Sequence, residues 1–147
     1  MLYFEDVEIG TVQSYGAYPV TREEVLSFAS AYDPQPFHLD DEAAAKTFFG
    51  KISASGWHTC AMTMRMIVDH GKAHPIAATG SPGIDKVRWR RPVYPGDTLS
   101  VKAHVLGKRD FPSRPHLGVV ENRYETFNQD GVLVMSFESD TLVERRK

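Results

Sequence analysis

The stretch Ser55-Gly-Trp-His-Thr-Cys-Ala-Met-Thr-Met-Arg-Met-Ile-Val-Asp-His70 is the helix around which the predicted fold is built. Its apolar residues recur at the i, i+3, i+4, i+7 spacing of one helical face, and Gly71 follows as a stop signal. The members of this predicted apolar face are Trp57, Cys60, Ala61, Met64, Ile67 and Val68. The other face, with Met62, Thr63 and Met66, is hardly polar, which predicts a helix surrounded by protein on most sides.

The second half of the chain has the alternating pattern of strands. Residues 99–105 alternate apolar and polar side chains, as in a half-buried antiparallel strand. Residues 119–127 and 132–143 form two further predicted strands, and Asp130-Gly131 between them is a strong hairpin signal. Strands of this kind that cover a long helix make an α+β fold.

The region before the long helix combines short strands with short helices. Residues 3–20 fit one or two short strands broken by glycines. Thr21-Arg-Glu-Glu24 matches a capping box, so a helix begins there and ends at Asp33-Pro34. The apolar stripe of this helix consists of Val25, Phe28, Ala29 and Tyr32. A second short helix is predicted from Asp40 through Phe49, with Gly50 as its stop.

The segment Ala31-Tyr-Asp-Pro-Gln-Pro-Phe-His38-Leu-Asp40 joins these two helices and carries an acid and an imidazole five residues apart. Pro34 and Pro36 fix φ and remove backbone donors, which predicts a stiff turn that is not regular helix. One interpretation is that Asp33 caps the turn and His38 packs at the next helix start. The other interpretation is catalytic. It combines Asp33 and His38 with the backbone amides at the start of the long helix, because chemistry beside a carbonyl requires an acid, a base and an amide donor.

Composition limits the class of protein. A chain of 147 residues is the size of one ordinary domain, so we expect a single domain over residues 1–147. The net charge of −2 indicates no general attraction to nucleic acid. Cys60 is the only cysteine, which excludes an internal disulfide and suits a reducing compartment. The acidic start Met1–Asp6 does not match a signal peptide and no stretch is long enough to span a membrane, so we expect a soluble, cytoplasmic protein with no membrane partner.

Three motifs together resemble the MaoC-like dehydratases, the (R)-specific enoyl-CoA hydratase group of the hotdog fold. They are Phe28-Ala-x-x-Tyr-Asp-Pro-Gln-Pro-Phe-His38-Leu-Asp40, Ala54-Ser-Gly-Trp-His-Thr59 and Arg88-Trp-x-x-Pro-Val-x-Pro-Gly-Asp-Thr98. The resemblance extends from about Val7 to Val143. It implies an antiparallel sheet wrapped around the long helix, a homodimer or a dimer of dimers, and syn hydration of trans-2-enoyl thioesters to (R)-3-hydroxyacyl products.

Residue by residue, the resemblance assigns Asp33 and His38 to the catalytic pair that holds and activates water, and Gly56 to the backbone amide that binds the thioester oxygen. The candidate substrate-binding residues are Ser55, Trp57, His58, Arg88 and Arg90. No metal or separate cofactor is implied, since coenzyme A enters as part of the acyl-CoA substrate. Gln35 stands where many members have Asn, and Met64 stands where some hydratases have a serine on the long helix.

Three features of the sequence have more than one interpretation. Lys86-Val-Arg-Trp-Arg-Arg91 could be an exposed strand face, or some of its basic residues could meet coenzyme A phosphates or pair across a dimer. His58 could line the site or pack in the interior. His70 and His74 are four apart, but Gly71 and Pro75 should break the helix that would align them, so a surface or loop role is expected instead of a metal site.

Two other functions are alternatives to hydration. A hotdog acyl-CoA thioesterase would use a carboxylate on or near the long helix, yet that helix has no acid before Asp69. A non-catalytic acyl-CoA-binding domain would be expected to lack the pair of Asp33 and His38. Hydration is therefore the predicted activity.

Overall fold

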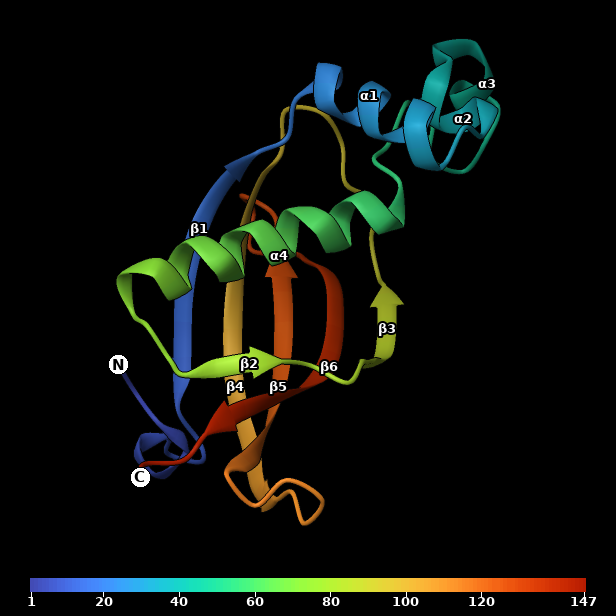
Figure 1. Ribbon diagram of the computed structural model, residues 1–147. Coiled ribbons are helices and arrows are strands. Elements are labelled where there is room, and N and C mark those ends of the chain that lie inside the picture. Colours follow the sequence, from blue (N-terminus) through green and yellow to red (C-terminus); the bar gives the residue numbers. More distant parts are fainter.

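A curved antiparallel sheet packs on one face of the long helix α4 in the computed structural model, which describes residues 1–147 (Figure 1). The helical elements are η1 (Phe4–Asp6), α1 (Arg22–Tyr32), α2 (Pro36–Leu39), α3 (Asp41–Ala45) and α4 (Gly56–Ala73). The strands are β1 (Val12–Pro19), β2 (Ala78–Gly80), β3 (Ile84–Trp89), β4 (Thr98–Asp110), β5 (Leu117–Phe127) and β6 (Leu133–Glu144). The strand order is β1-β4-β5-β6-β2, and β3 pairs with β6. The predicted α+β architecture is confirmed.

The face of α4 that packs on the sheet is not the one the apolar spacing predicted. The buried residues of the helix are His58, Thr59, Met62, Thr63 and Met66. Trp57 and Met64, from the predicted apolar face, are 61% and 50% exposed. The buried face tolerates a hydroxyl at Thr63 because Thr63 Oγ1 shares a hydrogen bond of 2.7 Å with Thr126 Oγ1 of β5. The helix also continues through Gly71 to Ala73, so the predicted stop was wrong.

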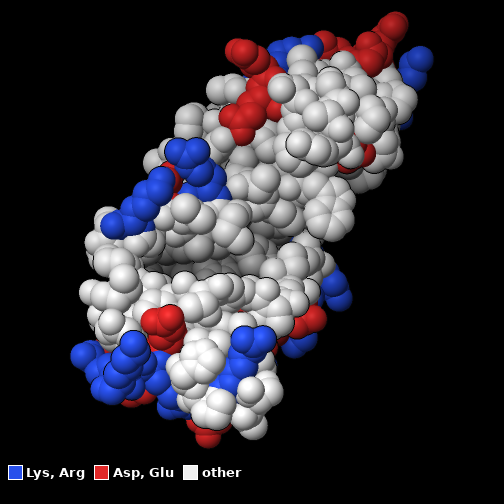
Figure 2. All heavy atoms as spheres, viewed as in Figure 1, with Lys and Arg blue, Asp and Glu red and all other residues white.

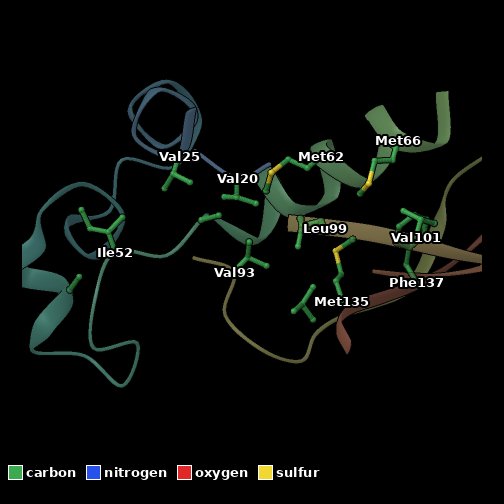
Figure 3. Packing of buried hydrophobic residues seen from close by; sticks show 13 residues of the cluster. Val20, Val25, Ile52, Met62, Met66, Val93, Leu99, Val101, Met135 and Phe137 are labelled. Atoms are coloured by element: carbon green, nitrogen blue, oxygen red, sulfur yellow. The ribbon is translucent and has the colours of Figure 1, made fainter. Parts of the chain in front are cut away.

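Methionines of α4 and apolar residues of the sheet form the main core (Figure 3). Met62 and Met66 point from the helix toward Leu99 of β4 and Phe137 of β6. The whole cluster contains Val20, Val25, Ala44, Ile52, Ala54, Met62, Met66, Val93, Leu99, Val101, Val134, Met135 and Phe137. Truncating one of the large members to alanine is expected to cost about 2–5 kcal/mol of stability.

Helices α1, α2 and α3 lie beyond one end of the sheet and form an overhang near the start of α4 (Figure 1). Thr21 Oγ1 accepts from the Glu24 amide at 3.2 Å, as a capping box requires. The reciprocal half is missing, because the Glu24 carboxylate accepts hydrogen bonds from Tyr18 and His58 instead. Tyr32 is exposed, so the apolar stripe of α1 ends one turn earlier than predicted.

The proline-rich segment is partly helical, which corrects the prediction of a turn without helix. Pro36 occupies the first position of the single-turn helix α2, where its missing N–H costs nothing. Gln35 before it is extended, with φ −82 and ψ 141, as the residue before a proline should be. Helix α3 ends at Ala45, several residues before the predicted end at Phe49.

The strand predictions hold in outline and differ at the edges. The Asn128–Gly131 hairpin is present, and Gly131 has the predicted positive φ of 71. Strand β2 was not predicted, and β4 extends to Asp110, farther than its alternating pattern indicated. A bulge in β3 places Lys86 at φ 52, which interrupts the alternation expected there. No helix in the chain is long and apolar enough to cross a membrane.

Candidate active site

A cavity of about 410 Å³ lies between the overhang, the start of α4 and the segment after β3. Its lining residues are Asp33, Gln35, His38, Phe48, Phe49, Ala54, Gly56, Trp57, Thr59, Trp89, Arg90, Arg91, Pro92 and Val93. The cavity therefore brings together Asp33, His38 and Gly56, together with Trp57 and Arg90, from the residues that the sequence singled out. Phe48, Phe49 and Trp89 add aromatic walls, and none of the three was predicted to line the site.

The Asp33 carboxylate is held from two sides at the C-terminal end of α1. Ser55 Oγ donates to Asp33 Oδ2 at 2.7 Å, and Gln35 Nε2 donates to Asp33 Oδ1 at 2.6 Å. Burial acts to raise the pKa of Asp33, but these two hydrogen bonds and the nearby His38 outweigh it, and the pKa lies below its usual range. Asp33 is thus ionised and fixed in direction.

His38 is a buried imidazole with one nitrogen assigned to a structural contact. Its Nδ1 lies 2.8 Å from the Ser53 carbonyl oxygen, which can only accept, so the ring proton sits on Nδ1. Nε2 is then the atom left for chemistry, and it lies 3.5 Å from Asp33 Oδ2. Phe37 and Phe49 pack against the ring and limit its rotation. Two proton-handling groups from one short segment therefore meet at the cavity wall.

Gly56 is the first residue of the 18-residue helix α4, and its amide donates to no acceptor within the chain. A side chain is excluded at this position because a Cβ would lie 2.4 Å from Cε2 of Trp89. Trp89 Nε1 also donates to the Gly56 carbonyl oxygen at 2.8 Å, and Trp57 packs edge-on against the indole of Trp89. Trp89 therefore accounts for the glycine and orients the start of the helix.

Ser55 and His58 do not line the cavity, although the sequence suggested substrate contacts for both. Ser55 is fully buried with its hydroxyl directed at Asp33. His58 Nε2 donates to Glu24 Oε1 at 3.0 Å and its ring stacks on Phe28 at 4.6 Å. These contacts join α1, which carries Asp33, to the start of α4. Of the two readings left open for His58, the structure shows the packed one.

Tyr18 joins Glu24 and His58 in a partly buried polar cluster on this side of α1. Its hydroxyl donates to the Glu24 carboxylate, and burial, followed by that carboxylate, raises the pKa of Tyr18 to about 12. Burial acts to raise the pKa of Glu24, but hydrogen bonds from Tyr18 and His58 hold it below its usual range. The carboxylate therefore stays charged and binds the two neighbours at once.

The basic segment divides between structural contacts and the cavity. Lys86 pairs with Glu138 at 3.2 Å, and Arg88 donates to the neighbouring Val87 carbonyl. Arg90 and Arg91 line the cavity, whereas Arg88 does not. Strand β3 ends at Trp89, so the backbone after it no longer alternates, and the successive residues Arg90 and Arg91 can both face the cavity. The cavity rim thus carries Arg90 and Arg91 as its positive charges.

The candidate metal pair of His70 and His74 has a packing role. The two rings stack at 4.4 Å, and His70 also stacks on Tyr15 at 3.9 Å. No group of three or more His, Cys, Asp or Glu side chains is arranged to hold a metal ion.

Comparison with known proteins gives one consistent family. A model of the family described as "MaoC like domain" matches residues 6–126. The uncharacterized protein YdeM of Bacillus subtilis is 31% identical over 96% of this chain and 98% of its own length. The 3-hydroxybutyryl-CoA dehydratase of Methylorubrum extorquens is 31% identical over 71% of this chain and 64% of its own length. The crystal structure of a MaoC-like dehydratase from Rhodospirillum rubrum superposes with a TM-score of 0.91 at 38% identity, covering 100% of this chain and 99% of that one. This similarity confirms the predicted hotdog fold.

Proposed function

Because this chain belongs to the MaoC-like domain family, we propose that it is a hydro-lyase that adds water reversibly to trans-2-enoyl-CoA thioesters to give (R)-3-hydroxyacyl-CoA. The observation that carries the proposal is the distance of 3.5 Å between Asp33 Oδ2 and His38 Nε2 beside the free Gly56 amide. A carboxylate and an imidazole at this separation can hold one water molecule between them.

The water molecule supplies both atoms that add across the double bond. Its oxygen bonds to C3 of the enoyl group while one of its protons passes to the pair of Asp33 and His38. The pair returns a proton to C2, so that the net change is the addition of one H₂O. We assign the two transfers to the pair and not to one residue each, because Asp33 Oδ2 and His38 Nε2 lie only 3.5 Å apart.

The Gly56 amide is suited to the charge that develops on the thioester oxygen. Attack at C3 moves electrons toward the carbonyl oxygen and forms an enolate-like state. The N-terminus of α4 carries a partial positive charge of about half a unit, and its first amides point outward. A donor already fixed in position stabilises this charge without reorganisation, and removal of such a donor typically costs about 10²–10³ in turnover.

The remaining walls fit the other parts of an acyl-CoA. Phe48, Phe49, Trp57 and Trp89 give apolar contact for an acyl group. The guanidinium groups of Arg90 and Arg91 on the rim can pair with the phosphates of coenzyme A. We include Arg90 and Arg91 in the proposed substrate site, and we remove Ser55, His58 and Arg88 from it.

We infer a homodimer from the surface that the single chain leaves uncovered. Trp57 and Met64 on α4 and Ile84 and Trp89 on β3 are large apolar side chains with 43–61% of their surface exposed. Strand β3 pairs only with β6, so its other edge is free to pair with a second copy. Trp57 and Trp89 also line the cavity, so a partner on this surface would help to enclose it.

Hydrolysis of the thioester is the reaction to be distinguished. The one acid of α4, Asp69, lies outside the cavity and forms ion pairs with Arg65 at 2.8 Å and Lys72 at 3.0 Å. It is therefore not available as the carboxylate of a thioesterase.

The proposed function is tested by incubating the protein with trans-2-butenoyl-CoA and following two signals. We expect loss of the conjugated chromophore with no release of free thiol. Thiol release with the double bond intact would indicate a thioesterase. Absence of both signals across acyl lengths would indicate an acyl-CoA-binding domain.

A further inference from the structure

A second cavity, which we call the distal cavity, lies between the C-terminal part of α4 and the sheet. Its volume is about 270 Å³, and it is bounded by α4, β1, β4, β5 and the N-terminal segment 2–11. None of its lining residues lines the catalytic cavity. The buried side chains of Met62, Met66 and Val101 lie along α4 and β4 between the two ends. The distal cavity is therefore a separate site and not a branch of the first.

Some polar side chains of the distal cavity, such as Asn122, are held by hydrogen bonds within the fold, but others make none. The rings of Tyr15, His70 and His74 form a stacked column along one wall. Nε2 of His70 is buried and has no hydrogen-bond partner, and the Tyr15 hydroxyl makes no side-chain hydrogen bond. Buried polar atoms are usually paired, so an unpaired imidazole nitrogen beside a cavity points to an external partner.

The interior of the distal cavity is uncharged. No Lys or Arg lines it, and its two carboxylates, Asp6 and Glu8, belong to the N-terminal segment at its edge. Burial raises the pKa of Tyr15 and lowers the pKa of His70, so both groups are neutral near pH 7. In Figure 2 the molecule is hollowed between α4 and β2, and the atoms inside this hollow are white, hence neither acidic nor basic.

We propose that the distal cavity binds a small uncharged molecule with an apolar ring or branched body and one hydrogen-bonding group. Ile67, Val105 and Val120 supply the apolar contact, and Tyr15 and His70 supply the polar contact. A cavity of about 150 Å³ can hold benzene, so this one has room for a six-membered ring with a short polar substituent. The absence of cationic residues disfavours phosphates and carboxylates, so this is not a second site for coenzyme A.

The test uses three probes of one shape: cyclohexylmethanol, cyclohexanecarboxylate and cyclohexylmethylamine. Each is titrated at pH 7 into the intact protein while backbone amide chemical shifts are recorded. We expect saturable shifts for the alcohol at residues 67–76 and 103–105, and binding of either ion that is at least tenfold weaker because a charge would lose its hydration. Shifts that do not saturate, that map to Asp33 and His38, or that are equal for all three probes overturn the proposal.

Two variants locate the binding. Ala103→Phe fills the distal cavity and should abolish the saturable shifts, while Lys102→Phe, on the opposite side of the same strand, should retain them. If Ala103→Phe does not fold, Tyr15→Phe decides, since loss of one neutral hydrogen bond should weaken alcohol binding about 2- to 10-fold. Unchanged binding in folded Ala103→Phe, or in Tyr15→Phe if Ala103→Phe does not fold, means that the alcohol binds elsewhere and rules the site out.

Discussion

The Gly56 amide can be tested by proline, but only after Trp89 has been taken into account. Proline at the first helical position removes the amide donor and is otherwise compatible with a helix. Ser55 before it has φ −53 and ψ 141, an extended conformation that a following proline accepts. However, any Cβ at position 56 would lie 2.4 Å from Cε2 of Trp89, where ordinary contact begins at 3.4 Å. In the wild-type background, a loss of activity would not separate the missing donor from the displaced indole.

The size of that clash sets the expected stability change. An overpacked substitution costs about 1–3 kcal/mol. Displacing Trp89 also breaks its 2.8 Å hydrogen bond to the Gly56 carbonyl, worth about 0.5–1.5 kcal/mol. Gly56→Ala should therefore lower the free energy of unfolding by about 1.5–4.5 kcal/mol. In the Trp89→Ala background the same substitution should cost nothing, or stabilise by about 0.4–1 kcal/mol through reduced chain entropy.

The kinetic comparison is made in the Trp89→Ala background. Gly56→Ala and Gly56→Pro both add a Cβ there, and only Gly56→Pro removes the amide. We expect turnover of an enoyl-CoA to be about 10²–10³ lower for Gly56→Pro than for Gly56→Ala, with both folded by circular dichroism. Equal turnover refutes the amide as the donor. An equal stability cost of Gly56→Ala with and without Trp89 refutes Trp89 as the reason for the glycine.

Three further outcomes are expected. Asp33→Asn and His38→Ala should each lower turnover about 10²–10⁴-fold. The double variant should lose much less than the product of the two single losses, because the residues act together. Near-normal turnover in a folded variant removes that residue from the mechanism. Ser55→Ala removes a charge-assisted hydrogen bond worth about 1.5–3 kcal/mol, so Asp33 should protonate at least about tenfold more easily and the acid limb of kcat/KM should move to higher pH. Ser53→Ala is the matched control, because Ser53 is buried and its Oγ has no hydrogen-bond partner. An acid limb that does not move in Ser55→Ala contradicts the contact between Ser55 and Asp33. The wild-type protein should sediment as a dimer at micromolar concentration. Met64→Lys, which puts a charge on the exposed apolar surface, should shift it toward monomer. A stable wild-type monomer contradicts the inferred interface.

The start of α4 and the final hairpin could be predicted because each depends on local chemistry. Gly56 is the first residue of α4. Asp130-Gly131 forms a tight turn in which Gly131 has positive φ. The buried face of α4 could not be predicted in this way. Apolar spacing assumes that polar groups avoid the core, yet Thr63 is buried opposite Thr126 and satisfies its hydroxyl there. Met64 is left outside, where the inferred second copy would cover it.

In the site, too, local sequence predicts some features, and others depend on how distant elements pack. Asp33 and His38 lie on a short segment with two prolines, so the sequence could show that they can meet, while the resemblance was needed to assign them as a pair. The roles of Ser55 and His58 depend on where α1 packs against α4, which no local pattern records. Arg88 and Arg90 are two residues apart and would share one face of a continuous strand, but β3 ends at Trp89, between them.

In the proposed mechanism, one water molecule held between Asp33 and His38 adds to one face of the double bond. The most direct measurement is hydration of trans-2-butenoyl-CoA in D₂O, with the product analysed by NMR and chiral separation. We expect one deuterium at C2 on the same face as the new hydroxyl, because both transfers come from groups 3.5 Å apart on one cavity wall. We also expect the (R)-3-hydroxyl that the family resemblance implies. Addition of hydroxyl and deuterium to opposite faces, or an (S) product, would contradict it.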